Sequence, residues 1–296
     1  MARRLLLDVS SLMYRAFFSI PTSVTGETGQ PVNAVHGYLD MCARLAADHR
    51  PSGLTHAFDH DWRPAPRVRA YAGYKAARPP DPEGLPEQFD ILRAALHALG
   101  QPVAEAKGWE AEDAIGSICA AAGARGRSDA VTGDRDLIQL VRDPQVRVLF
   151  TLRGVTQLRV LDEAGVQEHY GVPASRYADF ATLRGDPSDG LPGVRGVGEV
   201  TARSLIQSYP SLEALLEDAA SPRRSGAPLQ RSPSLRANVL ASREYLEAMR
   251  LVVPIRTDLK VTSTDLREPN EAALQELSKT HRLGGPVGRL RAALKI

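Results

Sequence analysis

The chain has 296 residues, of which 43% are hydrophobic and 24% charged, so it can form one large domain or two modest ones. Its 37 basic and 35 acidic residues leave a net charge of +2, which excludes a bulk polycation and requires nucleic-acid contacts to come from local basic patches. No apolar run approaches the roughly 20 residues of a membrane span, and the first run stops at Asp8, too early for a signal peptide.

Short apolar runs alternate with helical patterns over the first 150 residues. Expected strands lie at 4–9, 54–59, 102–106, 129–133 and 146–150, and expected helices at 34–49, 86–99, 109–124 and 134–142. Such alternation is typical of an α/β fold with a mostly parallel central sheet and helices on both faces. Cys42 and Cys119 fall in the helical patterns, where they fit buried thiols of a cytoplasmic protein better than a disulfide.

Beyond about residue 165 the patterns become mainly helical. We expect helices near 175–185, 211–219, 235–251 and 270–282, with a possible extended segment at 250–256. The Pro-, Ser- and Arg-rich stretch 221–234 predicts a mobile loop. The chain is therefore divided into an α/β core, residues 1–165, and a mainly helical region, residues 166–296.

Carboxylates follow the ends of four successive strands. In an open α/β sheet, ligands bind beyond the carboxyl ends of the strands, so these side chains should converge on one cleft. Any one of them alone is more often a helix cap or a solvated charge, but their conjunction favours a site for Mg²⁺ or Mn²⁺, which prefer oxygen ligands. The carboxylates concerned are Asp8, Asp59, Glu110, Glu112, Asp113, Asp134 and Asp136, with Asp186 and Asp189 in a later loop.

Two divalent ions among carboxylates indicate phosphoryl transfer, with water activated by metal. A phosphatase of the haloacid type would also use acids at a strand end, but it requires D-x-D after the first strand, where this chain has only Asp8. A receiver domain would be much smaller. Neither alternative explains the basic segment that follows the second strand.

Two further segments suit contacts with nucleic acid. Residues 60–84 mix five basic residues with Trp62, Tyr71 and Tyr74, which suits phosphates and unstacked bases, although a solvated loop explains this composition equally well. The stretch "GVRGVGEVTA", residues 193–202, predicts a glycine hairpin before a helix N-terminus, where backbone amides can bind a phosphate.

These segments resemble the 5′-nuclease superfamily, close to the 5′-nuclease domain of bacterial DNA polymerase I. The matching segments occur in family order from residue 4 to about 262, and they include "LLLDVSSLMYRAFF", "YKAARPP", "WEAEDAIG", "TGDRDLIQLV" and "LRGDPSDGLPGVRGVGEVTA". The chain ends near residue 296 without a polymerase region, so it resembles the stand-alone flap endonucleases and 5′-3′ exonucleases. The resemblance implies a PIN-like core, a helical arch at 60–84 and a helix-hairpin-helix-type motif.

The resemblance also implies residue roles. Asp8, Asp59, Glu110, Glu112, Asp134 and Asp136 would hold metals, with Asp113, Asp186 and Asp189 completing a second site. Lys75 and Arg78 would act at the scissile phosphate and, with Asp8 and Asp134, form the catalytic set. The implied DNA contacts are Tyr14, Arg15, Arg67, Lys75, Arg78, Gly193, Gly196, Gly198 and Thr201, with K⁺ as a possible ion at the hairpin. An extra residue in 60–66 leaves Arg63 as the alternative to Arg67.

Three positions depart from the pattern of the polymerase-I members. Glu112 stands where they usually have Asp, Gly190 replaces an Asn, and Val200 replaces a Lys, which removes one phosphate contact. The leading hypothesis is a structure-specific 5′ nuclease for branched, nicked or 5′-flapped DNA in replication or repair, with a DNA polymerase or ligase as plausible partners. The alternatives are a related ribonuclease and a DNA-binding module that has lost activity.

Overall fold

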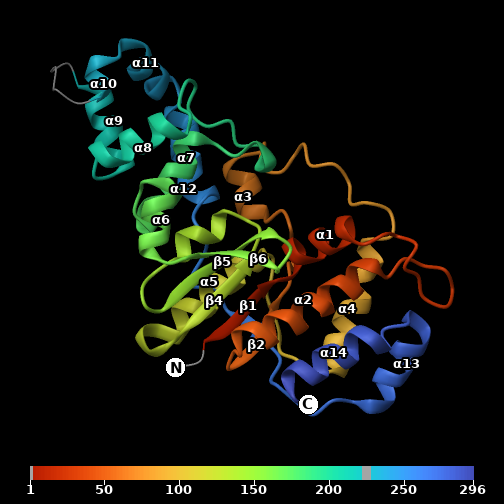
Figure 1. Cartoon of the computed structure of the whole chain (residues 1–296). Helices are drawn as coiled ribbons and strands as arrows, with labels where there is room; N and C mark the ends of the chain where they lie inside the picture. The colour runs from red at the N-terminus through yellow and green to blue at the C-terminus, as the bar shows by residue number, and fades with distance from the viewer. Residues whose placement is uncertain (1–2, 222–227) are drawn as a thin grey trace.

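A computed structural model of the chain describes residues 3–221 and 228–296. Its described residues form a seven-stranded sheet in the order β6-β5-β4-β1-β2-β3-β7 (Figure 1). The five central strands are parallel, and β6 and β7 are antiparallel edges. This arrangement confirms the predicted α/β class. The strands are β1 (Arg4–Asp8), β2 (Gly53–Ala57), β3 (Val103–Ala106), β4 (Ser128–Thr132), β5 (Val146–Arg153), β6 (Gln157–Leu161) and β7 (Val261–Ser263).

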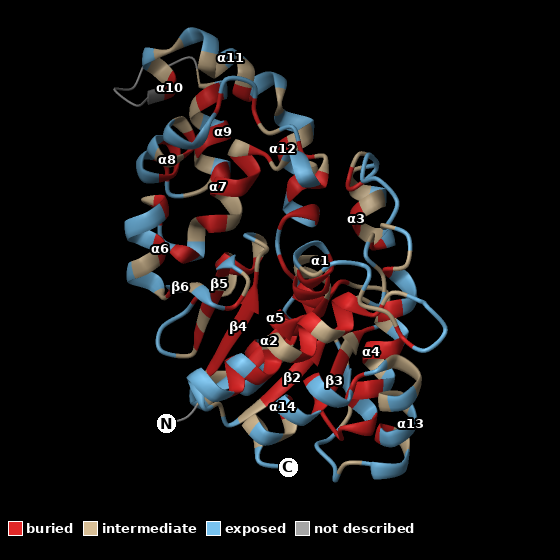
Figure 2. Cartoon of the chain, turned by 45° about the vertical axis from the view of Figure 1, so that its right-hand side comes forward, coloured by how far each residue is buried: buried red, intermediate tan, exposed pale blue. Residues whose placement is uncertain are grey.

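Both faces of the sheet are covered, as the unbroken apolar run of β1 predicts. Leu5 and Leu7 pack into one hydrophobic cluster, and Leu6 packs into the other, because successive side chains of a strand point to opposite faces. Figure 2 shows the strands as buried and the outer helix faces as exposed. The first cluster includes α1 (Val9–Ser19), α2 (Asn33–His49), α4 (Pro86–Ala98) and α14 (Gly284–Leu294), and the second includes α5 (Ala111–Ala122).

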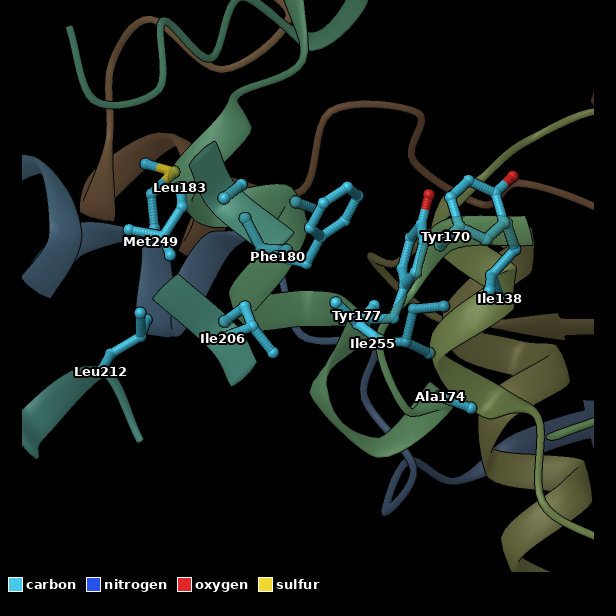
Figure 3. Close-up of a cluster of buried hydrophobic side chains, with 14 of the residues drawn as sticks. Ile138, Tyr170, Ala174, Tyr177, Phe180, Leu183, Ile206, Leu212, Met249 and Ile255 are labelled. Carbon is cyan, nitrogen blue, oxygen red and sulfur yellow. The ribbon is translucent and has the colours of Figure 1, made fainter. Parts of the chain in front are cut away.

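The helical region continues the second cluster and is not separated from it. Figure 3 shows Tyr177 and Phe180 of α7 between Ile138, which follows β4, and Met249 of α12. The carboxyl end of β4 is therefore packed directly against the helices. They are α6 (Glu163–Tyr170), α7 (Tyr177–Arg184), α8 (Glu199–Ser208), α9 (Leu212–Ala220), α10 (Pro228–Arg231), α11 (Pro233–Ala241) and α12 (Arg243–Val252), with 3₁₀ turns η3 (Ala174–Arg176) and η4 (Pro187–Asp189).

The last segment of the chain returns to the α/β layer. β7 pairs with β3, while α13 (Glu271–His281) and α14 lie beside α4 and α2 (Figure 1). The division of the chain at residue 165 remains a prediction. The structure adds that β7, α13 and α14, from the end of the chain, pack against the α/β layer. No helix among the described residues is long and apolar enough to cross a membrane.

Several local expectations were wrong. The predicted helix 134–142 is only a 3₁₀ helix, η2 (Asp136–Leu140), because β5 begins soon after it. The predicted helix 235–251 is two helices that meet at Ser242. The segment 250–256 is not a strand, since α12 continues to Val252 and the next residues are irregular. The sequence patterns also gave no signal for β6, β7, α6 or α14.

Two loop expectations have mixed outcomes. The segment 60–84 holds only one short helix, α3 (Ala65–Ala70), followed by turns, so the structure shows no long arch helix there. Residues 222–227 of the expected mobile loop lie outside the described residues. The remainder of that stretch contains α10 and the start of α11, which is capped by Ser232 and has Pro233 in its first turn.

Candidate active site

Asp8 ends β1 and caps α1. Its Oδ1 accepts a hydrogen bond from the Ser11 amide at 3.2 Å, and its Oδ2 accepts one from the Thr132 hydroxyl at 2.7 Å. Burial raises the pKa of the Asp8 carboxyl to about 7, and the nearby Asp59 adds to this rise. The site thus holds an anion at a place where its charge is disfavoured without a cation.

Asp59 follows β2 and links the first two strand ends to α5. Its carboxylate accepts hydrogen bonds from the Ser10 hydroxyl at 2.6 Å and from the Ala111 amide at 2.7 Å. The contact with the first turn of α5 is favourable because helix N-termini attract negative charge. Asp59 therefore lies beside both Asp8 and the acids of α5.

Three acids open α5, and the structure brings them together. Glu110 is the N-cap, and it forms a reciprocal capping box with Asp113. One carboxylate oxygen from each of Glu110, Glu112 and Asp113 lies within 4.8 Å of the others. All three side chains are buried, so their mutual repulsion requires a positive partner.

A second group of acids joins α5 to the end of β4. Carboxylate oxygens of Glu112, Asp134 and Asp136 all lie within 4.8 Å of one another. The Asp136 amide donates to Asp134 Oδ1 at 2.9 Å, which fixes this turn. Burial is the largest cause that raises the pKa of all three carboxyls. Repulsion from Asp136 and Asp134 adds to the rise at Glu112, and repulsion from Asp189 and Asp186 adds to it at Asp134 and Asp136.

Cationic side chains from residues 60–78 cover the first of these groups. Arg67 is fully buried and pairs with Glu110, with Glu112 at 3.1 Å and with Asp113 at 2.8 Å. The Lys75 ammonium pairs with Glu110, which also accepts the Tyr74 hydroxyl at 2.6 Å. Arg67 was expected to contact DNA, but its guanidinium here faces the carboxylates.

The loop after α7 brings Asp186 and Asp189 to the same region. Asp189 is buried and accepts a hydrogen bond from Arg78 at 2.6 Å, while its carbonyl accepts the Lys75 amide at 2.8 Å. Asp186 caps η4 through the Ser188 amide at 2.9 Å. The φ of Gly190 is 72°, and a Cβ there would lie 2.5 Å from the Gly73 carbonyl oxygen. Glycine at this position therefore allows the loop after α7 to pack closely against the backbone of Gly73.

The glycine hairpin forms where it was predicted. Gly193 and Gly196 have positive φ, and a Cβ at Gly193 would lie 2.5 Å from the Arg184 carbonyl oxygen. Gly198 is the N-cap of α8, it has no side chain to cap the first amides, and no atom lies within 4 Å of a Cβ built there. Thr201 lies in the first turn of α8, and Val200 is 76% exposed beside it.

The other expected DNA-contact residues lie on α1. The Tyr14 hydroxyl donates to Asp81, and Arg15 donates to the Thr151 carbonyl at 3.2 Å. Burial and the Asp81 contact raise the pKa of Tyr14 above its usual range. Both side chains are partly exposed and are tied to neighbouring segments in this structure.

Sequence patterns missed several residues that organise the site. Thr132 bridges two acids, since its Oγ1 also accepts the Asp134 amide at 2.8 Å. Trp109 places its ring 5.7 Å from the Arg67 guanidinium carbon. The polar Thr132 in the apolar strand "DAVT" was an available signal, whereas nothing local distinguishes Trp109 from a core aromatic residue.

The donor chemistry of the site fits hard divalent ions. The clustered ligand atoms are all carboxylate oxygens, and burial raises the pKa of Glu112 and Asp136, so their charged forms would be stabilised by a cation. Acids at the carboxyl edge of a mostly parallel sheet, beside a glycine hairpin that presents a helix N-terminus, define a metal-dependent nuclease as the class.

Comparison with known proteins agrees with that class. A family model described as 5′-3′ exonuclease, N-terminal resolvase-like domain, matches residues 3–171, and one described as 5′-3′ exonuclease, C-terminal SAM fold, matches residues 172–276. A 5′-3′ exonuclease of Streptomyces coelicolor is 42% identical, over 98% of this chain and 99% of that protein. DNA polymerase I of Mycobacterium leprae is 40% identical over 86% of this chain and 28% of its own length.

The fold has solved counterparts as well. The structure of T5 D15 protein co-crystallised with metal ions covers 99% of this chain and 98% of its own, with a TM-score of 0.67 and 17% identity. The chain belongs to the 5′-3′ exonuclease family. The predicted superfamily and the prediction of an enzyme are thereby confirmed.

Proposed function

We propose that the chain is a divalent-metal-dependent 5′ nuclease that hydrolyses phosphodiesters near the 5′ ends of nicked, branched or flapped DNA. The observation that carries this proposal is the convergence of carboxylates from β1, β2, α5 and β4 on one edge of the sheet. Membership of the 5′-3′ exonuclease family supports it. We expect Mg²⁺ or Mn²⁺, because the donors are oxygens.

The carboxylates form two groups, each of which would bind one divalent ion. Glu112 belongs to both clusters, one with Glu110 and Asp113 and one with Asp134 and Asp136, so two cations would share it. Asp8 and Asp59 lie at the adjacent strand ends, and Asp186 and Asp189 approach from the loop after α7. Bound divalent cations supply a hydroxide nucleophile at neutral pH and neutralise charge on the phosphate.

Lys75 and Arg78 are the residues that we assign to contacts with the scissile phosphate. Both side chains already lie against the acids, Lys75 at Glu110 and Arg78 at Asp189. Arg78 keeps 36% of its side chain exposed, so it can reach a substrate at the rim without rearrangement of the core. Removing either cation should slow cleavage of bound DNA more than it weakens binding.

The hairpin at 193–202 would hold the duplex part of the substrate. Gly198 and the first turn of α8 present backbone amides that suit a phosphate, and K⁺ could join the hairpin carbonyls to the DNA backbone. Tyr14, Arg15 and the aromatic residues of 60–84 would meet the unpaired 5′ end. Val200 offers no charge there, so Arg195 or Arg203 would supply the missing contact.

Several wider expectations accompany this proposal. Cys42 and Cys119 are buried free thiols, which suits the reducing cytoplasm. A DNA polymerase or ligase is a plausible partner, because the products of 5′ trimming are their substrates. A related ribonuclease and an inactive DNA-binding module are the alternatives that the test must separate.

The test is cleavage of end-labelled flap, nicked, single-stranded and closed circular DNA, and of RNA, with Mg²⁺, Mn²⁺ or chelator. We expect divalent-dependent release from 5′ ends, the highest rates on flaps or nicks, and none on closed circles. Asp134→Ala should remove most turnover while DNA binding remains, and the exposed Asp48→Asn serves as a charge-matched control. Full cleavage in chelator, products from 3′ ends, or cleavage of RNA alone would each refute the proposal.

A further inference from the structure

Arg67 is a fully buried arginine in the centre of the candidate metal ligands. Its Nη1 lies 3.1 Å from Glu112 and 2.9 Å from Asp113, and its Nη2 lies 2.8 Å from the other Asp113 oxygen. Nη1 also pairs with Glu110. One guanidinium therefore contacts all three carboxylates of the α5 group, which is the same set of side chains that could hold one divalent ion.

The surroundings of Arg67 fix it in this place. The Tyr74 and Trp109 rings lie 5.8 and 5.7 Å from its guanidinium carbon, which favours a cation between them. The Pro254 carbonyl accepts a weaker bond from Nη2 at 3.4 Å. No phosphate could reach this guanidinium without prior displacement of the side chain, because none of its surface is exposed.

The two carboxylate groups differ in how their charge is balanced. Arg67 and Lys75 neutralise the group of Glu110, Glu112 and Asp113. Within residues 3–221 and 228–296, by contrast, no arginine or lysine forms an ion pair with Asp134 or Asp136. A divalent ion would therefore compete with a cation for every ligand of the first group, but at the second group only for Glu112, which Arg67 also contacts.

We propose that Arg67 is a positioning residue that serves as the internal counter-ion of the α5 carboxylates and competes with a divalent ion for them. Before metal arrives, it holds Glu110, Glu112 and Asp113 together. Glu112, Asp134 and Asp136 would bind a divalent ion more readily, and Glu110, Glu112 and Asp113 would bind one only if Arg67 and its segment moved away. This inference rests on the proposed function, since the competing ion is the proposed cofactor.

The displacement has a consequence for Lys75. Arg67 and Lys75 belong to one short segment, and both bind Glu110. A cation at the α5 group would weaken both ion pairs together because it competes for the same oxygens. Metal binding would then release the Lys75 ammonium toward a substrate phosphate. Occupation of the site by metal and the availability of Lys75 for the substrate would thus be coupled.

The experiment measures Mn²⁺ binding without DNA by titration calorimetry on Arg67→Met, Arg67→Lys and Arg69→Met. Arg69 is the matched control, because it lies exposed on the same helix and is two residues away. We expect Arg67→Met to bind Mn²⁺ about tenfold more tightly at one site, a common scale for coupling between ligands. Arg67→Lys should remain near wild type, and Arg69→Met should change less than about twofold.

Thermal denaturation tests the same competition through stability. In chelator Arg67→Met should melt below wild type, because Glu112 and Asp113 lose their buried guanidinium partner and Glu110 keeps only Lys75 as a cation. Mn²⁺ should raise the melting temperature of the variant more than that of wild type. A variant that folds only with Mn²⁺ also supports the proposal. A variant that fails to fold even in saturating Mn²⁺, or that binds Mn²⁺ no more tightly than Arg69→Met, overturns it.

DNA binding separates this role from a direct phosphate contact. With Ca²⁺ in place of a catalytic metal, Arg67→Met should bind flap DNA about as tightly as Arg69→Met does. A much larger loss of DNA affinity in Arg67→Met would overturn the counter-ion role. Mn²⁺ binding is measured without substrate, so it does not depend on nuclease activity. Absence of nuclease activity in wild type would refute the proposed function, whereas the comparison of Mn²⁺ affinities would still test the competition between Arg67 and metal.

Discussion

Thr132 at the end of β4 donates its hydroxyl proton to Asp8 at the end of the neighbouring parallel strand β1, with 2.7 Å between the oxygens. The same Thr132 oxygen accepts the Asp134 amide at 2.8 Å. One buried hydroxyl therefore sets the spacing between two acids that we assign to catalysis.

Thr132→Val should slow cleavage about tenfold or more, because it keeps the shape of the side chain but removes both hydrogen bonds. A misplaced ligand lowers the rate even when substrate binding is intact. Single-turnover rates at saturating metal measure the effect. Thr132→Ser retains the hydroxyl and should stay near wild type, and equal rates in Val and Ser variants would contradict the bridging role.

Asp8→Asn should stabilise the protein in chelator while it abolishes turnover. Burial and Asp59 raise the pKa of Asp8 to about 7, so the ionised carboxylate is disfavoured in the folded state at pH 8. Asparagine removes this cost, which amounts to about 4 kcal/mol at most since each pKa unit is worth about 1.4 kcal/mol.

The comparison uses urea denaturation at pH 8, with chelator and with saturating Mn²⁺. The order of stability should reverse with Mn²⁺, because the metal stabilises the wild-type site more. If Asp8→Asn is the less stable protein under both conditions, Asp8 is a structural cap and not part of a strained ligand set.

Gly198→Leu should weaken duplex binding without unfolding the chain. A side chain at residue 198 meets no atom within 4 Å, and Gly198 has φ −90°, so the fold tolerates the change. Leucine would block approach of a DNA backbone to the first amides of α8. Duplex affinity at matched salt, with the thermal midpoint as the folding control, measures the effect.

Gly193 provides the contrast. Its φ of 68° and the 2.5 Å approach of a Cβ to the Arg184 carbonyl oxygen predict that Gly193→Ala lowers stability itself. Unchanged duplex affinity in Gly198→Leu would show that the hairpin does not contact DNA.

His56 should make the fold sensitive to acid. It is fully buried in β2, its Nδ1 lies 2.7 Å from the Tyr38 hydroxyl, and burial lowers its pKa from 6.5 to about 3. The unfolded chain takes up a proton below pH 6.5 and the folded chain does not, so stability falls as the pH drops from 6.5 toward 3. At pH 5 the cost is about 2 kcal/mol.

The His56→Gln variant has no imidazole to protonate, so it isolates the contribution of His56 to the pH dependence of stability. The stability of wild type relative to His56→Gln should fall by about 2 kcal/mol between pH 7 and pH 5, measured by urea denaturation. A difference that is the same at both pH values would show that His56 is protonated in the folded state or is reached by water.

The site could be predicted from sequence mainly where local patterns coincide with topology. Asp8, Asp59, Glu110 and Asp134 follow apolar runs, and parallel strands joined by helices bring their carboxyl ends to one edge. The glycine hairpin was predictable because residues with positive φ favour glycine. The sequence could not place β7 or α14, whose pairing depends on partners more than 150 residues away.

The amino-acid sequence by itself determined the fold class and which carboxylates gather at the edge of the sheet, because strand periodicity and the order of elements settle these features. The family was indicated by the resemblance of its motifs, not by periodicity. Only the tertiary structure decided what those carboxylates contact. Arg67 follows Asp59 in a segment read as a DNA-binding arch, yet its guanidinium is buried against Glu110, Glu112 and Asp113. The reason is physical: charges brought together from distant segments in a buried site must be balanced by whichever cation packing allows to reach them.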